Sequence, residues 1–254
     1  MNRIVFDWLR KSYGETLALD AFDLQVAAGE IVSIVGPSGC GKTTALNLAA
    51  GFETPTSGRV DVNGRTAVVF QQPALFPWLS VLDNVTLGMR CRGVPRKFCD
   101  TRARALLHDV DLGDFLQHYP YQLSGGMQQR VQIARALVSE PEILLMDEPF
   151  GSLDYQTRLL MQKLLLRLWS RFKPTILFVT HDVGEAIFIS DRVVAMSRRP
   201  GKIMRECAIR ASKPRGYDFL GSPEYTAYAT EFIHAVQSQV EDIEPHVAVA
   251  PAAS

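Results

Sequence analysis

The segment Gly36–Thr44 (GPSGCGKTT) limits the possible folds of this chain more than any other stretch. It fits the pattern G-x-x-x-x-G-K-[ST] in full, and it lies between a β-branched run (Glu30–Gly36) and a helical pattern closed by Gly51. Glycines let the backbone wrap closely around a phosphate, and the N–H groups of the turn and of the helix N-terminus attract anions. The segment therefore predicts a phosphate-binding loop, the alternative being a glycine-rich turn that binds nothing.

Strand and helix patterns alternate along the rest of the chain. Apolar runs of strand length lie at 142–149, 175–180 and 192–197, and helical patterns lie at 155–172 and 184–190. Strands separated by helices predict an α/β fold with a parallel sheet that helices cover on both faces.

Two regions depart from this alternation. Gly58–Gly64 and Arg65–Phe70 look like short strands around a turn at Asn63–Gly64. From Val81 to about Tyr119 the pattern is helical, which predicts a helical insertion between strands of the sheet.

Composition narrows the class of protein. The 254 residues are 47% hydrophobic and 21% charged, as in a soluble globular protein. The chain has 27 Lys and Arg residues and 27 Asp and Glu residues, so its net charge does not indicate a nucleic-acid partner. The charged N-terminal stretch is not a secretory signal, and no apolar run approaches the roughly 18 residues of a membrane span. The cysteines lack metal or redox spacing and are expected to be reduced thiols of a cytosolic protein: Cys40, Cys91, Cys99 and Cys207.

An acidic pair supplies the second part of the expected phosphate chemistry. Asp147 ends the apolar run ILLMD, so its carboxylate should emerge beside the phosphate loop and hold Mg²⁺. Glu148 follows directly and is a candidate general base for an attacking water. Lys42 should reach the β- and γ-phosphates, and Thr43 should ligate Mg²⁺. The alternative for the acidic pair is a solvated strand end.

Further motifs occur at fixed places along the chain: Tyr13, Gln71, LSGGMQQR (Leu123–Arg130), GSLD (Gly151–Asp154) and His181. Together with the phosphate loop and the acidic pair, they resemble the motif series of the nucleotide-binding subunits of ABC transporters. The resemblance covers roughly Tyr13 to Gly201. One departure is Met127, which stands where the commonest signature motif has Gln.

The resemblance implies the ABC ATPase cassette: a P-loop NTPase with a mainly parallel sheet core, an antiparallel β subdomain and a helical subdomain insertion. The ATP-binding domain would span residues 1–240, with the helical insertion at about 80–140. Residues 241–254 would form a flexible tail.

The resemblance also implies a site for ATP and Mg²⁺ and a role for each matching residue. The expected ATP-binding residues are Tyr13, Gly36, Pro37, Ser38, Gly39, Cys40, Gly41, Lys42, Thr43, Thr44, Gln71, Ser124, Gly125, Gly126 and His181. The expected catalytic residues are Glu148, His181, Lys42 and Gln71, and the expected metal ligands are Thr43, Gln71 and Asp147. Ser124, Gly125 and Gly126 would hold a phosphate bound by a second, head-to-tail subunit, so a homodimer is expected.

The partners that the resemblance implies lie at a membrane. The subunit would sit peripherally on the cytoplasmic face of the inner membrane, bound to permease subunits that receive solute from a periplasmic or lipid-anchored solute-binding protein. The apolar patch Leu75–Trp78 is either core or the surface that meets the permease, and the interface is favoured. LFPW and SRRPGKI (Ser197–Ile203) resemble the importer branch for nitrate, sulfonate and taurine, which predicts uptake of a small polar solute.

Two rival functions remain open at this point. A P-loop kinase would share the phosphate loop but would not use LSGGMQQR or His181. A non-transport ABC ATPase that acts on a macromolecular complex would keep every motif.

Overall fold

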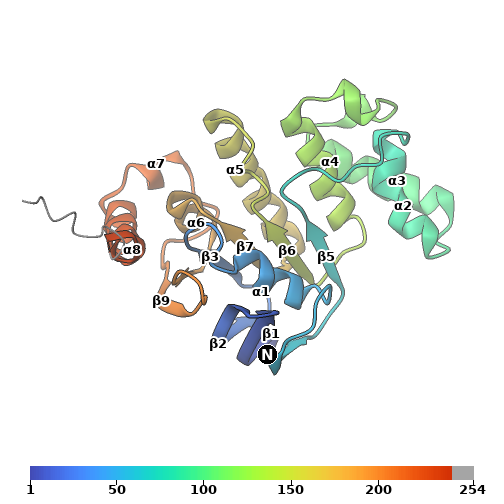
Figure 1. Cartoon of the computed structure of the whole chain (residues 1–254). Coiled ribbons are helices and arrows are strands. Elements are labelled where there is room, and N and C mark those ends of the chain that lie inside the picture. Colours follow the sequence, from blue (N-terminus) through green and yellow to red (C-terminus); the bar gives the residue numbers. More distant parts are fainter. Residues whose placement is uncertain (242–254) are drawn as a thin grey trace, which may run out of the picture.

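A computed structural model describes residues 1–241 of the chain, and the tail expected at 241–254 lies outside the described residues except for Glu241. Its centre is a six-stranded sheet (Figure 1). The strands run in the order β5 (Thr66–Val69), β6 (Ile143–Asp147), β7 (Thr175–Thr180), β3 (Ile31–Val35), β8 (Arg192–Met196) and β9 (Ile203–Ala208). All neighbouring pairs are parallel except β8 and β9. The predicted α/β fold with a mainly parallel sheet is confirmed.

A second sheet of three antiparallel strands packs beside the first, with β1 (Asn2–Tyr13) between β2 (Thr16–Ala27) and β4 (Ser57–Val62). The antiparallel subdomain implied by the resemblance is therefore present. The strands on either side of Asn63–Gly64 do not pair with each other, because β4 belongs to this sheet and β5 to the six-stranded one. The N–H of Asn63 bonds to Arg3 O at 2.8 Å, whereas the N–H of Glu142 bonds to Arg65 O at 2.8 Å. The turn thus carries the chain from one sheet to the other.

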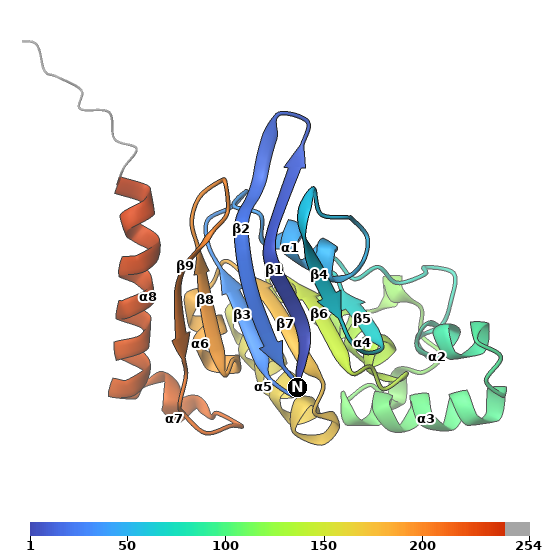
Figure 2. The same ribbon diagram turned by 90° about the horizontal axis from the view of Figure 1, so that it is seen from below.

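Helices cover both faces of the six-stranded sheet (Figures 1 and 2). Helix α1 (Lys42–Ala49) lies between the two sheets, and α4 (Gly125–Leu137), α5 (Tyr155–Phe172) and α6 (Val183–Ile189) lie on the opposite face. Helices α2 (Val81–Cys91) and α3 (Arg96–Asp109) lie beyond β5, and α7 (Tyr217–Leu220) and α8 (Pro223–Glu241) lie beyond β9. Two short 3₁₀ helices precede α4, η1 (Gly113–Phe115) and η2 (Pro120–Gln122).

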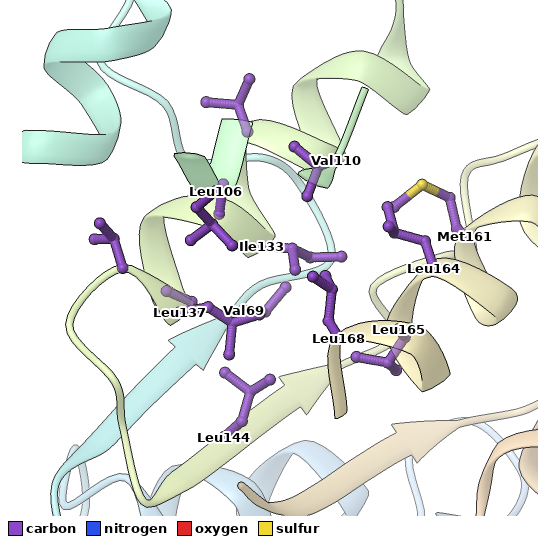
Figure 3. Packing of buried hydrophobic residues seen from close by; sticks show 14 of the residues in the cluster. Val69, Leu106, Val110, Ile133, Leu137, Leu144, Met161, Leu164, Leu165 and Leu168 are labelled. Carbon is purple, nitrogen blue, oxygen red and sulfur yellow. The ribbon is translucent and has the colours of Figure 1, made fainter. Parts of the chain in front are cut away.

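Alternation along the strands divides the core into two layers. Leu144 and Met146 of β6 point toward α4 and α5, whereas Ile143 and Leu145 point toward α1 and the antiparallel sheet. Figure 3 shows the first layer, in which Leu144 meets side chains of α4 and α5. Because both faces are buried, the central strands are mostly apolar, as the sequence runs predicted, and Ser33 is a buried polar exception in β3.

The helical stretch expected from Val81 to about Tyr119 is broken. Helix α2 ends at Cys91 and α3 begins at Arg96, with Gly93 at a φ of 79° and Pro95 directly before α3. Proline has no N–H to continue a helix, and glycine adopts a positive φ without steric cost, so the pair marks the break. None of the helices within residues 1–241 combines the length and apolarity needed to cross a membrane.

Candidate active site

The phosphate loop follows the buried strand β3 and leads directly into α1. Gly41 has a φ of 103°, and a Cβ built there would lie 2.8 Å from Leu19 Cδ2, so only glycine fits. The Lys42 side chain folds over the loop, and its Nζ donates to Gly36 O at 2.8 Å and to Pro37 O at 3.0 Å. A buried ammonium is thus bonded to two carbonyls of the loop, and its positive charge lies where the loop would bind phosphate.

Thr43, in the first turn of α1, lies beside Asp147, the last residue of β6. Thr43 Oγ1 donates to Asp147 Oδ1 at 3.2 Å, which brings together the two residues expected to hold Mg²⁺. Burial raises the pKa of Asp147 above its usual value, and the hydrogen bond from Thr43 opposes this rise. A half-buried carboxylate beside a hydroxyl supplies the hard oxygen donors that Mg²⁺ prefers, and waters and phosphates would supply the remaining ligands. The residues present therefore fit a Mg²⁺ ion.

Glu148 and His181 meet at the ends of neighbouring parallel strands. His181 Nδ1 lies 2.9 Å from Glu148 Oε2, and the imidazole tautomer that carries its hydrogen on Nδ1 donates to this carboxylate. Glu148 has a φ of 41°, which lies in a backbone region that residues other than glycine rarely adopt. The backbone N–H of Glu148 donates to Val179 O at 2.9 Å. Local strain of this kind, held by surrounding structure, is typical of functional sites.

Gln71 lies near this pair. A Cβ built on Gly151 would be 3.9 Å from Gln71 Nε2 and 3.7 Å from Glu148 Oε2, so both side chains flank the same point. The glycine that opens GSLD therefore leaves room between the glutamine and the acid.

A cavity of about 310 Å³ opens over the phosphate loop. Tyr13 and Glu148 line it together with several loop residues: Ser38, Gly39, Gly41, Lys42, Thr43 and Thr44. The hydroxyl of Tyr13 donates to Glu53, and burial and this acceptor raise the pKa of the phenol. Tyr13 is 45% exposed, with the Lys11 ammonium 4.8 Å from its ring centroid.

Three residues that line the cavity were missed from the sequence: Thr16, Ala18 and Arg199. Arg199 follows β8 at the sheet edge where His181 follows β7, so its place after a strand was the available signal. Thr16 and Ala18 lie in β2, where no motif marks them.

The signature segment lies elsewhere. Ser124 caps α4, its Oγ accepting from Met127 N at 3.3 Å, and neither it nor the two glycines line the cavity over the phosphate loop. A Cβ on Gly126 would be 2.8 Å from Thr157 Cγ2 of α5, so glycine is needed for the two helices to pack this closely. Within one chain, the structure does not bring the signature segment and the phosphate loop together.

Residues 19–151 match the family model described as ABC transporter. The chain belongs to the ABC transporter family. It is 51% identical to the taurine import ATP-binding protein TauB of Chromobacterium violaceum over 74% of this chain and 75% of that protein. It is 43% identical to the nitrate import ATP-binding protein NrtD of Synechocystis over 86% of this chain and 87% of that protein.

A solved structure agrees with the assignment of the fold. The chain superposes with a TM-score of 0.72 on a dimeric ATP-binding cassette in a post-hydrolysis state bound to ADP and Pi. The two are 34% identical over 82% of this chain and 100% of that chain. As an ABC transporter ATP-binding subunit, the chain is an ATPase, and the P-loop kinase alternative is excluded.

Proposed function

We propose that the chain is the ATPase subunit of an importer and that ATP-driven dimerisation and hydrolysis power uptake of a small polar solute through a separate permease. One observation carries the proposal: Lys42, Thr43, Asp147, Glu148 and His181 converge at the carboxyl end of the parallel sheet. Relatives named as taurine and nitrate import proteins support a solute of the nitrate, sulfonate or taurine class.

Each residue of this cluster has a distinct proposed role in hydrolysis. Lys42 leaves its loop carbonyls to bind the β- and γ-phosphates, and Glu148 accepts the proton of the attacking water. His181 orients the Glu148 carboxylate through its Nδ1–H. Thr43, Asp147 and Gln71 hold Mg²⁺, whose charge would stabilise the phosphate oxygens. The ring of Tyr13 stacks on the adenine of ATP, and the backbone of the phosphate loop binds the phosphates.

The signature segment acts in a second subunit. Ser124, Gly125 and Gly126 are proposed to bind the γ-phosphate held by the partner's Lys42, so each ATP joins two chains. The exposed position of this helix N-terminus, away from the chain's own cavity, supports this arrangement, as does the dimeric relative. We take residues 1–240 as one cassette, with its helical insertion at about 80–140.

A permease is the proposed membrane partner. Leu75 packs against the core, whereas Phe76 is 37% and Trp78 is 71% exposed, their rings 5.5 Å apart. An exposed aromatic pair in the loop after Gln71 can connect the nucleotide site to a membrane subunit. The complex would lie on the cytoplasmic face of the inner membrane and receive solute from a solute-binding protein.

Dimerisation supplies the direct test of the two-subunit site. In a Glu148→Gln background, ATP should produce dimers by size exclusion, and adding Ser124→Arg should abolish them because the bulky cation blocks closure. Ser170→Arg, at an exposed serine near the far end of α5, is the matched control and should leave dimers intact. Dimers that persist with Ser124→Arg would refute phosphate binding across the interface.

Uptake assays test the transport function. Cells that lack this chain should lose accumulation of labelled taurine, an alkanesulfonate or nitrate, and the native chain, not Lys42→Ala, should restore it. Normal uptake of all three solutes in the deletion strain would refute the proposed solute class. Copurification with a macromolecular assembly in place of a permease would instead favour the non-transport alternative.

A further inference from the structure

Glu185 is a buried carboxylate outside the motifs of the nucleotide site. It lies in the first turn of α6, the short helix that begins directly after His181 and Asp182, and it is only 5% exposed. It does not line the cavity over the phosphate loop. A buried carboxylate without a pairing function is costly, so its partners indicate why it is there.

The Glu185 carboxylate binds one side-chain donor from each of two neighbouring elements. The hydroxyl of Thr180, at the end of β7, donates to Oε2 at 2.5 Å. Gln162 of α5 donates to Oε1 through Nε2 at 3.2 Å. Both oxygens are therefore satisfied inside the protein, and the carboxylate joins β7, α5 and α6.

The same hydrogen bonds hold the residues on either side of His181. Thr180 Oγ1 accepts from the N–H of Asp182 at 3.0 Å while it donates to Glu185, so the residues on both sides of His181 are joined. Asp182 in turn accepts from Glu185 N at 3.0 Å, which caps α6, and from Arg158 at 3.1 Å. The carboxylate of Glu185 thus holds Thr180 on one side of His181, and the Thr180 hydroxyl and the backbone N–H of Glu185 hold Asp182 on the other.

We propose that Glu185 is a positioning residue for hydrolysis, fixing the loop at Thr180 and Asp182 so that the His181 ring meets Glu148. The inference rests on the proposed role of His181. Glu185 does not line the cavity over the phosphate loop, so it is not proposed to contact nucleotide. It acts by keeping the His181 backbone in the one conformation that delivers Nδ1 to the Glu148 carboxylate, 2.9 Å away.

This role predicts a specific kinetic pattern. Glu185→Leu removes both hydrogen-bond acceptors and should lower kcat by about ten- to a hundredfold, because small displacements of reacting groups are costly. The Kd for ATP should stay within about twofold, since the phosphate loop is untouched. Glu185→Gln can accept from Gln162 and donate to Thr180 Oγ1, so it should retain kcat within about threefold.

Two threonines of β7 supply a second test and its matched control. Thr180→Val should reproduce the loss of kcat, and the double variant with Glu185→Leu should be no worse than either alone, because both remove the same link. Thr175→Val removes a buried threonine at the opposite end of β7, where its Oγ1 accepts from Gly29 N at 2.9 Å. This variant should keep kcat even where its melting temperature falls.

The outcomes separate the inference from the function on which it rests. Loss of kcat in Glu185→Leu and Thr180→Val, with retention in Glu185→Gln and Thr175→Val, supports the inference. A second outcome would overturn the inference: His181→Ala abolishes hydrolysis, Glu185→Leu fails to fold, and Thr180→Val and Glu185→Gln both behave as the native chain. Glu185 would then be only structural. If His181→Ala hydrolyses ATP normally, the proposed role of His181 itself fails.

Discussion

Glu148 combines two features that single it out among the acidic residues of the site. Its backbone is held at a positive φ, and its carboxylate faces both His181 and Gly151. Glu148→Gln keeps the size of the side chain and removes its ability to accept a proton. We expect ATP binding to be retained and phosphate release to fall by about 10²–10⁴-fold.

Labelled-ATP binding and a phosphate-release assay measure the two effects separately. Lys42→Ala is the contrasting variant, since it should weaken ATP binding itself. Hydrolysis at a near-native rate by purified Glu148→Gln would remove the residue from the role of general base.

Titration of Glu185 should be visible in the stability of the protein. Burial raises the pKa of this carboxyl to about 7, against the opposing hydrogen bonds from Thr180 and Gln162, with the charges of Asp182 and Arg158 nearby. The folded protein therefore binds the proton more tightly than the unfolded chain does. This contribution to stability is complete below pH 4.5 and is lost as pH rises toward 7.

Urea unfolding between pH 5 and pH 8 measures this effect. In Glu185→Gln the corresponding fall in unfolding free energy should disappear, because the amide does not titrate. Equal pH profiles for the native chain and for Glu185→Gln would contradict the raised pKa.

Among single residues, the sequence predicted best the positions of those that end or directly follow an apolar strand. Asp147 and His181 each follow an apolar strand, and parallel strands bring their carboxyl ends to one edge. Arg199 lies in SRRPGKI, three residues after β8, but that segment was used only to assign the importer branch, and Glu185 has no marker beyond its place in a helix. Their surroundings depend on contacts between distant segments, which no local pattern encodes.

Helix α6 is held at its C-terminal end by a buried arginine. Arg215 is 4% exposed. It donates through Nη1 to the carbonyls of Ile187, Phe188 and Ser190, and through Nη2 to those of Ile209 and Ala211. Burial lowers the pKa of the guanidinium to about 10. The segment after β9 thereby satisfies carbonyls at the end of the helix and places a cation there.

Arg215→Met should destabilise the protein by at least about 2 kcal/mol, because several buried carbonyls lose a charged donor. Thermal and urea unfolding measure the change. Arg210→Met is the control, since the Arg210 side chain is exposed, and it should have little effect. Similar stabilities for the two variants would show that the five hydrogen bonds contribute nothing measurable.

The bounds of helices and strands were predicted closely where the sequence has a clear helical or strand pattern of apolar residues. The helix expected at 155–172 and the strand expected at 175–180 have these bounds in the structure. The resemblance implied an antiparallel β subdomain, but the strands β1 and β2 were not predicted as elements. The assignment of β4 and β5 to different sheets was not predicted, since a turn signal does not specify which edge each strand joins.

The whole subunit should depend on its exposed aromatic pair for membrane attachment. Phe76→Ser combined with Trp78→Ser should leave ATP binding intact and reduce recovery with permease-containing membranes. Flotation of the complex and solute uptake measure the effect. Phe98→Ser, at an exposed phenylalanine on α3, should change neither.

Asn84 holds the backbone of the loop that carries Phe76 and Trp78. Its buried side chain bonds to the backbone of Phe76 on both sides, at 2.8 and 3.1 Å, so the loop keeps its shape after the substitutions. Normal uptake by the double variant would show that the pair is not the permease contact, and insolubility would favour a core role.

The place of β3 in the sheet has a consequence for how a cell makes this protein. β3 carries the phosphate loop, yet it is bonded on both sides to strands that begin only at Thr175 and Arg192. While the ribosome is still adding the residues before them, this apolar strand has no neighbour in the sheet. Nucleotide therefore cannot assist folding early in translation, and nascent chains interrupted before Thr175 should be substrates for chaperones and proteases.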